Sequence, residues 1–157
     1  MSEEKEIQIR RQLRQCGDCT KCCEGWLANE IHGHFTWPGK KCQFVETGTG
    51  CSIYEDRPET CQRFECEWLK NYDVPAWLKP NKSNVILRMK YLDNIKYLEI
   101  IEAGEKLSAE VLSWALSLIV KKEIENIKYQ ISGGWCYFGT EEFYNAIRKN
   151  FDASQIH

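Results

Sequence analysis

The chain has 157 residues, of which 43% are hydrophobic, and its 21 Lys and Arg residues nearly balance 23 Asp and Glu residues. This composition provides a hydrophobic core and excludes overall disorder, and without a long basic run it disfavours nucleic acid as a partner. No stretch of about 18 consecutive apolar residues is present, so we expect no membrane span. The charged N-terminus lacks the apolar segment of a signal peptide, and a cytoplasmic protein is expected.

The first part of the chain, residues 1–70, is predicted to be a cysteine-cluster metal-binding region. A short charged helix is expected over residues 3–15, directly before four closely spaced cysteines. Residues 24–57 are rich in glycine and carry several turn signals, which predicts a loop-dominated segment that needs a cross-link. A helix is then predicted from Pro58 to Tyr72, because proline fits the first helical turn without losing a hydrogen bond.

Residues 71–82 contain two prolines and several polar side chains, a composition typical of a linker. Residues 83–157 are predicted to form a small α+β region of ββαβα order, from alternating and helical hydrophobic patterns. Strands are expected over 84–91, 95–101 and 126–131, and helices over 106–124 and 140–151. The predicted fold class is therefore α+β, with the loop-rich N-terminal half packed on this region.

Cysteine is the most informative residue type, since eight of the nine cysteines lie in the first 66 residues. Thiols remain reduced in the cytoplasm, so this density indicates metal binding rather than a disulfide framework. The candidate metal ligands are Cys16, Cys19, Cys22, Cys23, Cys42, Cys51, Cys61 and Cys66.

The spacing of the first four cysteines predicts how they are used. Two successive Cys-x-x-Cys turns bring the sulfurs of Cys16, Cys19 and Cys22 toward one centre. The adjacent Cys23 is expected to point in a different direction, and either to serve a second centre or to bridge outward. With the four downstream cysteines, the set allows two tetrathiolate sites, or one cluster with additional structural ligands.

Iron–sulfur and zinc are the two cofactors that this pattern allows. Structural zinc usually takes two separated Cys-x-x-Cys pairs, and the downstream cysteines contain no such pair. Three cysteines at successive three-residue spacing are closer to the ligand pattern of an iron–sulfur cubane, whose fourth ligand is distant in sequence. An iron–sulfur cluster is therefore slightly favoured, and zinc is retained as the alternative.

The ordered cysteine pattern resembles the YkgJ-type cysteine-cluster family, which is described as a zinc- or iron-chelating domain. The resemblance covers residues 14–68 and is carried by Cys-Gly-Asp-Cys-Thr-Lys-Cys-Cys and by Gly-Cys-Ser-Ile-Tyr-Glu-Asp-Arg-Pro-Glu-Thr-Cys-Gln-Arg-Phe. It departs from the family pattern at Gln62, where Arg is expected. The resemblance implies a metal-binding protein of the CxxCxxCC type.

Three kinds of function remain open from the sequence. The first is a metal-binding protein, and the second is an iron–sulfur-dependent enzyme of redox or methyl-transfer chemistry. The third is a zinc-stabilised module that binds a protein partner. No Ser-His-Asp set, phosphate-binding loop or paired acid and base identifies catalytic residues, which stay unknown.

Several other residues have structural roles in our interpretation. With eight cysteines available, His32 and His34 are expected to be solvent-facing loop residues rather than ligands. Cys136 lies in an aromatic setting and is expected to be a buried, unreactive thiol. Arg57 is expected to bind a carbonyl or carboxylate in the turn before the predicted helix.

Overall fold

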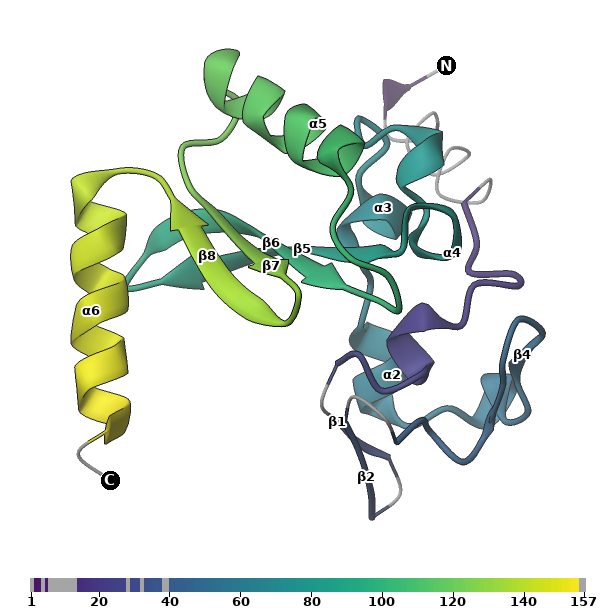
Figure 1. The fold of residues 1–157 in the computed structure, drawn as a ribbon. Helices are drawn as coiled ribbons and strands as arrows, with labels where there is room; N and C mark the ends of the chain where they lie inside the picture. Colours follow the sequence, from purple (N-terminus) through teal and green to yellow (C-terminus); the bar gives the residue numbers. More distant parts are fainter. Residues whose placement is uncertain are drawn as a thin grey trace. The chain divides into compact units, whose positions relative to one another are not determined.

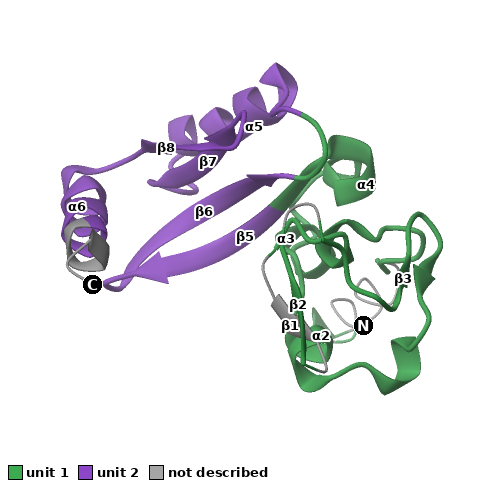
Figure 2. Cartoon of the chain, turned by 60° about the horizontal axis from the view of Figure 1, so that its bottom comes forward, with its two compact units in different colours: residues 1–86, 103–105 green, residues 87–102, 106–157 purple. Residues whose placement is uncertain are grey.

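The computed structural model describes residues 2–3, 5, 14–27, 29–31, 33–37 and 40–155 (Figure 1). Most of the helix predicted over 3–15 lies outside these residues, as does His32. The chain divides into two compact units (Figure 2). The first comprises residues 1–86 and 103–105, and the second comprises residues 87–102 and 106–157.

The first unit is built from short elements. Its strands form two antiparallel pairs, β1 (Asn29–Ile31) with β2 (His34–Thr36), and β3 (Val45–Glu46) with β4 (Gly50–Cys51). Its helical segments are η1 (Lys21–Cys23), η2 (Tyr54–Asp56), α2 (Glu59–Arg63), α3 (Glu67–Lys70), η3 (Ala76–Leu78) and α4 (Pro80–Ser83). Elements this short contribute little stability by themselves, so the loop-dominated region depends on tertiary contacts.

The helix predicted from Pro58 to Tyr72 is divided in two. Phe64 ends α2 with extended backbone angles, φ −75° and ψ 120°. Cys66 is also extended, with φ −67° and ψ 158°, and it precedes the first residue of α3. The break places Cys61 within α2 and Cys66 at the start of a separate helix, so their thiols need not share one helix face.

Residues 71–82, predicted as a linker, belong to the first unit and contain helical segments. Pro75 precedes η3 and Pro80 is the first residue of α4, so both prolines begin helical turns instead of marking open chain. Val74 and Leu78 are buried, at 3% and 0% exposure. Two buried apolar side chains therefore lie within a segment whose polar composition is typical of a linker.

Gly25 allows a close backbone approach at the end of the cysteine run. Its φ is +92°, and a Cβ atom at this position would lie 2.3 Å from the carbonyl oxygen of Trp37 and 2.6 Å from that of Lys40. Trp37 and Lys40 are joined to each other by two backbone hydrogen bonds, of 3.2 and 2.7 Å. Only glycine combines this backbone conformation with this contact.

The second unit contains a sheet in the order β5-β6-β7-β8 (Figure 1). Its elements are β5 (Val85–Leu92), β6 (Ile95–Glu102), α5 (Ala109–Val120), β7 (Ile127–Ile131), β8 (Gly134–Phe138) and α6 (Glu141–Gln155). The first two residues of β5, Val85 and Ile86, belong to the first unit. The predicted hairpin is confirmed: Asp93 and Asn94 join β5 to β6 with φ of 48° and 65°, as a two-residue turn requires. β6 and β7 pair in parallel, and α5 connects them.

Strand β8 was not predicted, so the observed order is ββαββα. Ser132 and Gly133 turn the chain with φ of 51° and 81°, and β8 then pairs antiparallel with β7. The carboxylate of Glu102 accepts a 2.7 Å hydrogen bond from the Gly133 N–H and holds this turn. Because glycine is typical of turns, the Gly-Gly pair at the start of β8 did not indicate a strand in the sequence. Cys136 lies in β8 and is half-buried, not fully buried as expected.

Each helix of the second unit buries the side chains of one face in the core. Helix α5 begins at the predicted Ser108 cap, whose Oγ accepts a 3.2 Å hydrogen bond from the Val111 N–H. The Phe143 ring of α6 is buried, and its centroid is 5.3 Å from that of Tyr97 in β6. The prediction of a mixed helical and sheet protein, with its sheet in the C-terminal half, is confirmed. Among the described residues, no helix has the length and apolar character needed to cross a membrane.

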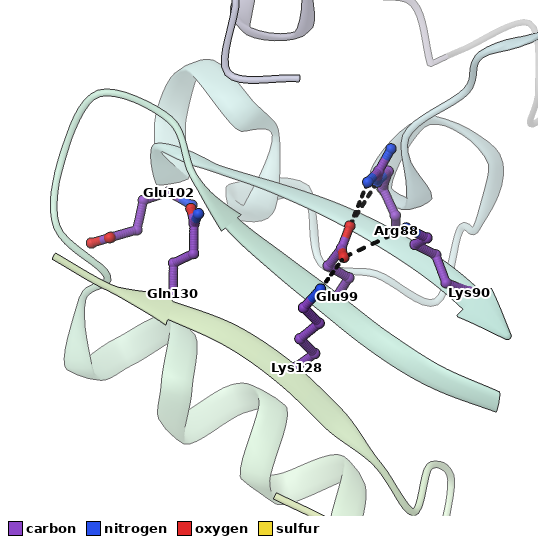
Figure 3. Close-up of polar contacts among 6 residues, drawn as sticks. All are labelled: Arg88, Lys90, Glu99, Glu102, Lys128 and Gln130. Carbon is purple, nitrogen blue, oxygen red and sulfur yellow. Dashed lines mark hydrogen bonds and ion pairs between the residues drawn. The ribbon is translucent and has the colours of Figure 1, made fainter. Parts of the chain in front are cut away.

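One buried carboxylate organises charges within the sheet (Figure 3). Glu99 in β6 is 2% exposed, and its Oε1 accepts hydrogen bonds from Arg88 Nε at 2.9 Å and from Arg88 Nη2 at 2.6 Å. Its Oε2 lies 3.7 Å from Lys90 Nζ and 3.5 Å from Lys128 Nζ. Three cations on β5 and β7, the two strands that flank β6, therefore offset the desolvation of a single carboxylate.

Candidate metal centre

All eight predicted cysteine ligands lie in the first unit, and all are free thiols. Cys42 is buried and the other seven are half-buried. Cys136, the ninth cysteine, belongs to the second unit. The tertiary structure thus gathers into one unit a set of thiols that spans residues 16 to 66.

The Cys-x-x-Cys run forms two tight turns. The N–H of Cys19 donates to the carbonyl of Cys16 at 2.8 Å, and Gly17 between them has φ +53°. The second turn continues into η1, which contains Cys22 and Cys23. Their Sγ atoms are 4.0 Å apart. The adjacent side chains therefore do not point in opposite directions, because one turn of 3₁₀ helix holds both sulfurs on neighbouring faces.

A first group of thiols lines a small hollow of about 20 Å³. Its cysteines are Cys16, Cys19, Cys22 and Cys66. The other walls are apolar and include Trp68, at 8% exposure, and Ile86, at 0%. The three-sulfur arm predicted from the sequence is thus joined by Cys66, which of the eight predicted ligands is the most distant from it along the chain.

Arg14 attaches the start of the cysteine run to the segment that follows Cys66. Its guanidinium donates to the carbonyls of Trp68 at 2.6 Å, Asn71 at 3.0 Å and Val74 at 2.7 Å. The same group lies 4.8 Å from the centroid of the Trp68 ring and 5.0 Å from that of Tyr72. Sequence analysis missed this residue, because an arginine beside a cysteine cluster is usually a solvated charge.

The remaining four cysteines, Cys23, Cys42, Cys51 and Cys61, line a larger cavity of about 390 Å³. The N–H of Cys42 donates to the carbonyl of Cys23 at 2.8 Å, and Cys51 lies opposite Val45 in the β3–β4 pair. Cys16, Cys19 and Cys22 line this cavity as well as the small hollow. These three residues therefore form a wall common to both spaces.

Thr20 connects the cysteine run to the turn between β3 and β4. It is 3% exposed, and its Oγ1 donates to Glu24 Oε2 at 2.7 Å and accepts from the N–H of Gly48 at 3.0 Å. This contact holds the turn before Cys51 beside η1. Sequence analysis did not single out Thr20, since only the distant partner Gly48 reveals its role.

The side chains of Arg57 and Gln62 form hydrogen bonds with the backbone of the segment before Cys61. Arg57 Nε donates to the carbonyl of Tyr54 at 2.8 Å, which confirms the predicted contact with a carbonyl in the turn before the helix. The Arg57 guanidinium also lies 3.7 Å from the centroid of the Tyr54 ring. Gln62, the departure from the family pattern, donates from its side chain to the carbonyl of Arg57.

The thiols of the first group are held in their protonated form. Burial raises the pKa of Cys66 to about 11, with further contributions from Cys16 and Cys19. Burial also raises the pKa of Cys16, which the charges of Cys19 and Cys23 increase further. The pKa of Cys19 is raised mainly by burial as well. Thiolates that line one small space repel one another unless a cation lies among them.

Cys22 and Cys23 titrate as a pair. A hydrogen bond between their sulfurs lowers the pKa of Cys23 to about 7, with help from the positive charge of Arg57. The same hydrogen bond, together with burial, raises the pKa of Cys22 well above its usual value. The remaining four cysteines form the second group. Within it, burial and the charges of Cys23, Cys42 and Cys51 raise the pKa of Cys61.

Of the two histidines weighed as ligands, His34 lies within the described residues. It is in β2, and its side chain is exposed. It lines neither of the two spaces described above. Throughout the described part of the chain, no three His, Cys, Asp or Glu side chains have already converged as a metal ion requires. Metal binding would therefore need the thiols to draw closer together within each group.

Comparison with known proteins returned no match: no family model, curated protein or solved structure is similar to this chain.

Proposed function

We propose that the protein binds metal, as an iron–sulfur cluster or zinc, through the eight cysteines of its first unit. The observation that carries this proposal is that all eight line two spaces with a common wall. They come from separate short elements and loops over 50 residues of chain. The CxxCxxCC spacing of the first four cysteines is compatible with the same chemistry.

The chemistry of the donors supports a soft or borderline metal. Both spaces are lined by thiols, which suit iron–sulfur clusters and zinc and are poor ligands for magnesium or calcium. A bound cation would offset the mutual repulsion of the thiolates and displace the protons that burial now retains. Metal affinity should therefore fall as the pH falls, since protons and metal compete for the same sulfurs.

A metal also fits the architecture of the first unit. The strands of β3 and β4 each have two residues, and α2 and α3 have five and four. A centre with ligands from several such segments would connect elements that bury little apolar surface of their own. Binding energy of this kind becomes folding energy, as in other small metal-stabilised domains.

Anaerobic purification followed by elemental analysis and an ultraviolet–visible spectrum tests the proposal. Stoichiometric iron with broad absorption at about 400 nm identifies an iron–sulfur cluster. Stoichiometric zinc without this absorption identifies a zinc site. The matched control is C136S, which should keep the metal content of the unsubstituted chain. Folded protein with neither metal would contradict the proposal.

A further inference from the structure

The eight cysteines differ in the size and accessibility of the space that they line. If they bind metal as proposed above, this difference divides them into two centres. We infer that the two groups form centres of different kinds. Cys16, Cys19, Cys22 and Cys66 form a closed structural centre, and Cys23, Cys42, Cys51 and Cys61 form an accessible centre that a small exogenous molecule can reach.

The size of the small hollow argues for a closed site. Its volume of about 20 Å³ holds one atom-sized occupant, since a single water needs about 10–15 Å³ measured in this way. Cys66 lines this hollow and not the larger cavity, whereas Cys16, Cys19 and Cys22 line both, so the closed centre requires an ion that holds their sulfurs on the side of Cys66. Apolar residues cover the hollow: Pro80 and Ile86 are buried, and Leu69 is half-buried. Four thiolates around one ion would leave no position for a further ligand, which is the arrangement of structural sites.

The larger cavity has the opposite character. Its volume of about 390 Å³ lies within the range of small-molecule sites, and far exceeds what one ion needs. Aromatic and aliphatic side chains line it, among them Phe44, Ile53 and Phe64. Arg57 adds one cationic group to these walls. A metal held here would meet a space suited to a small, partly apolar anion.

The backbone shows how two centres can lie so close together. Cys22 and Cys23 are neighbours in η1, and their sulfurs are 4.0 Å apart. Cys22 lines both spaces, whereas Cys23 lines only the larger. The adjacent pair therefore marks the boundary between the two groups, and this gives the Cys-Cys dipeptide a role that a single centre would not need.

Release of the native metal to an anionic aromatic chelator tests this division. For zinc the probe is 4-(2-pyridylazo)resorcinol, and for iron it is bathophenanthroline disulfonate, used anaerobically. We expect two phases whose rates differ at least tenfold. After the fast phase, alkylation and mass spectrometry should label Cys23, Cys42, Cys51 and Cys61, while Cys16, Cys19, Cys22 and Cys66 remain protected.

Matched variants assign each phase. C61S should remove the fast phase and keep the slow one, C66S should remove the slow phase, and C136S should keep both. Labelling of the unsubstituted protein decides the matter if C66S does not fold. Release in one phase, or early labelling of Cys66, would overturn the division while leaving metal binding intact. Absence of metal would instead overturn the proposed function, and the division with it.

Discussion

The guanidinium of Arg14 lies 4.8 Å from the centroid of the Trp68 ring and donates a 2.6 Å hydrogen bond to the carbonyl of the same residue. The two residues are 54 positions apart, and each stands two residues from a cysteine of the first group, Cys16 and Cys66. This contact therefore fixes both ends of the four-thiol set. It explains how the Cys66 thiol, directly before α3, meets the Cys-x-x-Cys turns.

Replacement of Arg14 by alanine should lower the free energy of unfolding by about 3 kcal/mol, since charged hydrogen bonds and the contact with two rings are lost together. Urea unfolding followed by circular dichroism measures this. The matched control is R63A, because Arg63 pairs with Glu59 on the surface, where both side chains are over 70% exposed. That control should change stability by less than about 1 kcal/mol. Equal losses in the two variants would show that Arg14 does not hold the site.

Cys19→Ser should destabilise the protein much more than Cys136→Ser. Cys19 lines both thiol-rich spaces, whereas Cys136 lies half-buried in β8 of the other unit. Under the proposed metal binding, the loss of one ligand removes part of the folding energy that the metal provides. Thermal unfolding of both variants, purified with their native metal, is the measurement. The same melting temperature for both would contradict a ligand role for Cys19.

In reduced, metal-free protein, Cys23 should be the first of the Cys22, Cys23 and Cys66 thiols to react with iodoacetamide at pH 7. Its pKa of about 7 leaves roughly half of it as thiolate, whereas Cys66, with a pKa of about 11, is about one part in ten thousand thiolate. The alkylation rate of Cys23 should level off just above pH 7, while that of Cys66 continues to rise. Peptide mass spectrometry across pH 6–10 measures both rates. Faster labelling of Cys66 than of Cys23 at pH 7 would refute the assignment.

Glu99→Gln should destabilise the sheet by about 2–3 kcal/mol, because it leaves Arg88, Lys90 and Lys128 facing one another without the buried carboxylate. The estimate is reduced because the three cationic side chains are 24–41% exposed. E125Q is the control, since Glu125 is exposed, and it should change stability by less than about 0.5 kcal/mol. Urea unfolding compares the two variants. Metal content should be unaffected in both, as both residues belong to the second unit.

Local patterns predicted those elements whose signal is local. The hairpin around Asp93 and Asn94, the Ser108 cap and the apolar face of α5 each follow from a few adjacent residues. The failures have a common cause in distant contacts. Strand β8 depends on Glu102 holding the Gly133 turn, and residues 71–82 bury Leu78 despite their polar composition.

The sequence by itself determined which atoms are available: eight thiols in one half of the chain, three of them at the spacing of consecutive tight turns. Only the tertiary structure decided their grouping, with Cys66 beside the first three and Cys23 with the others around the larger cavity. The physical reason is that spacing controls geometry over a few residues, whereas Cys66 is placed by bonds from Arg14 to the chain that follows it. Such bonds depend on chain folding over more than 50 residues, which no local pattern encodes.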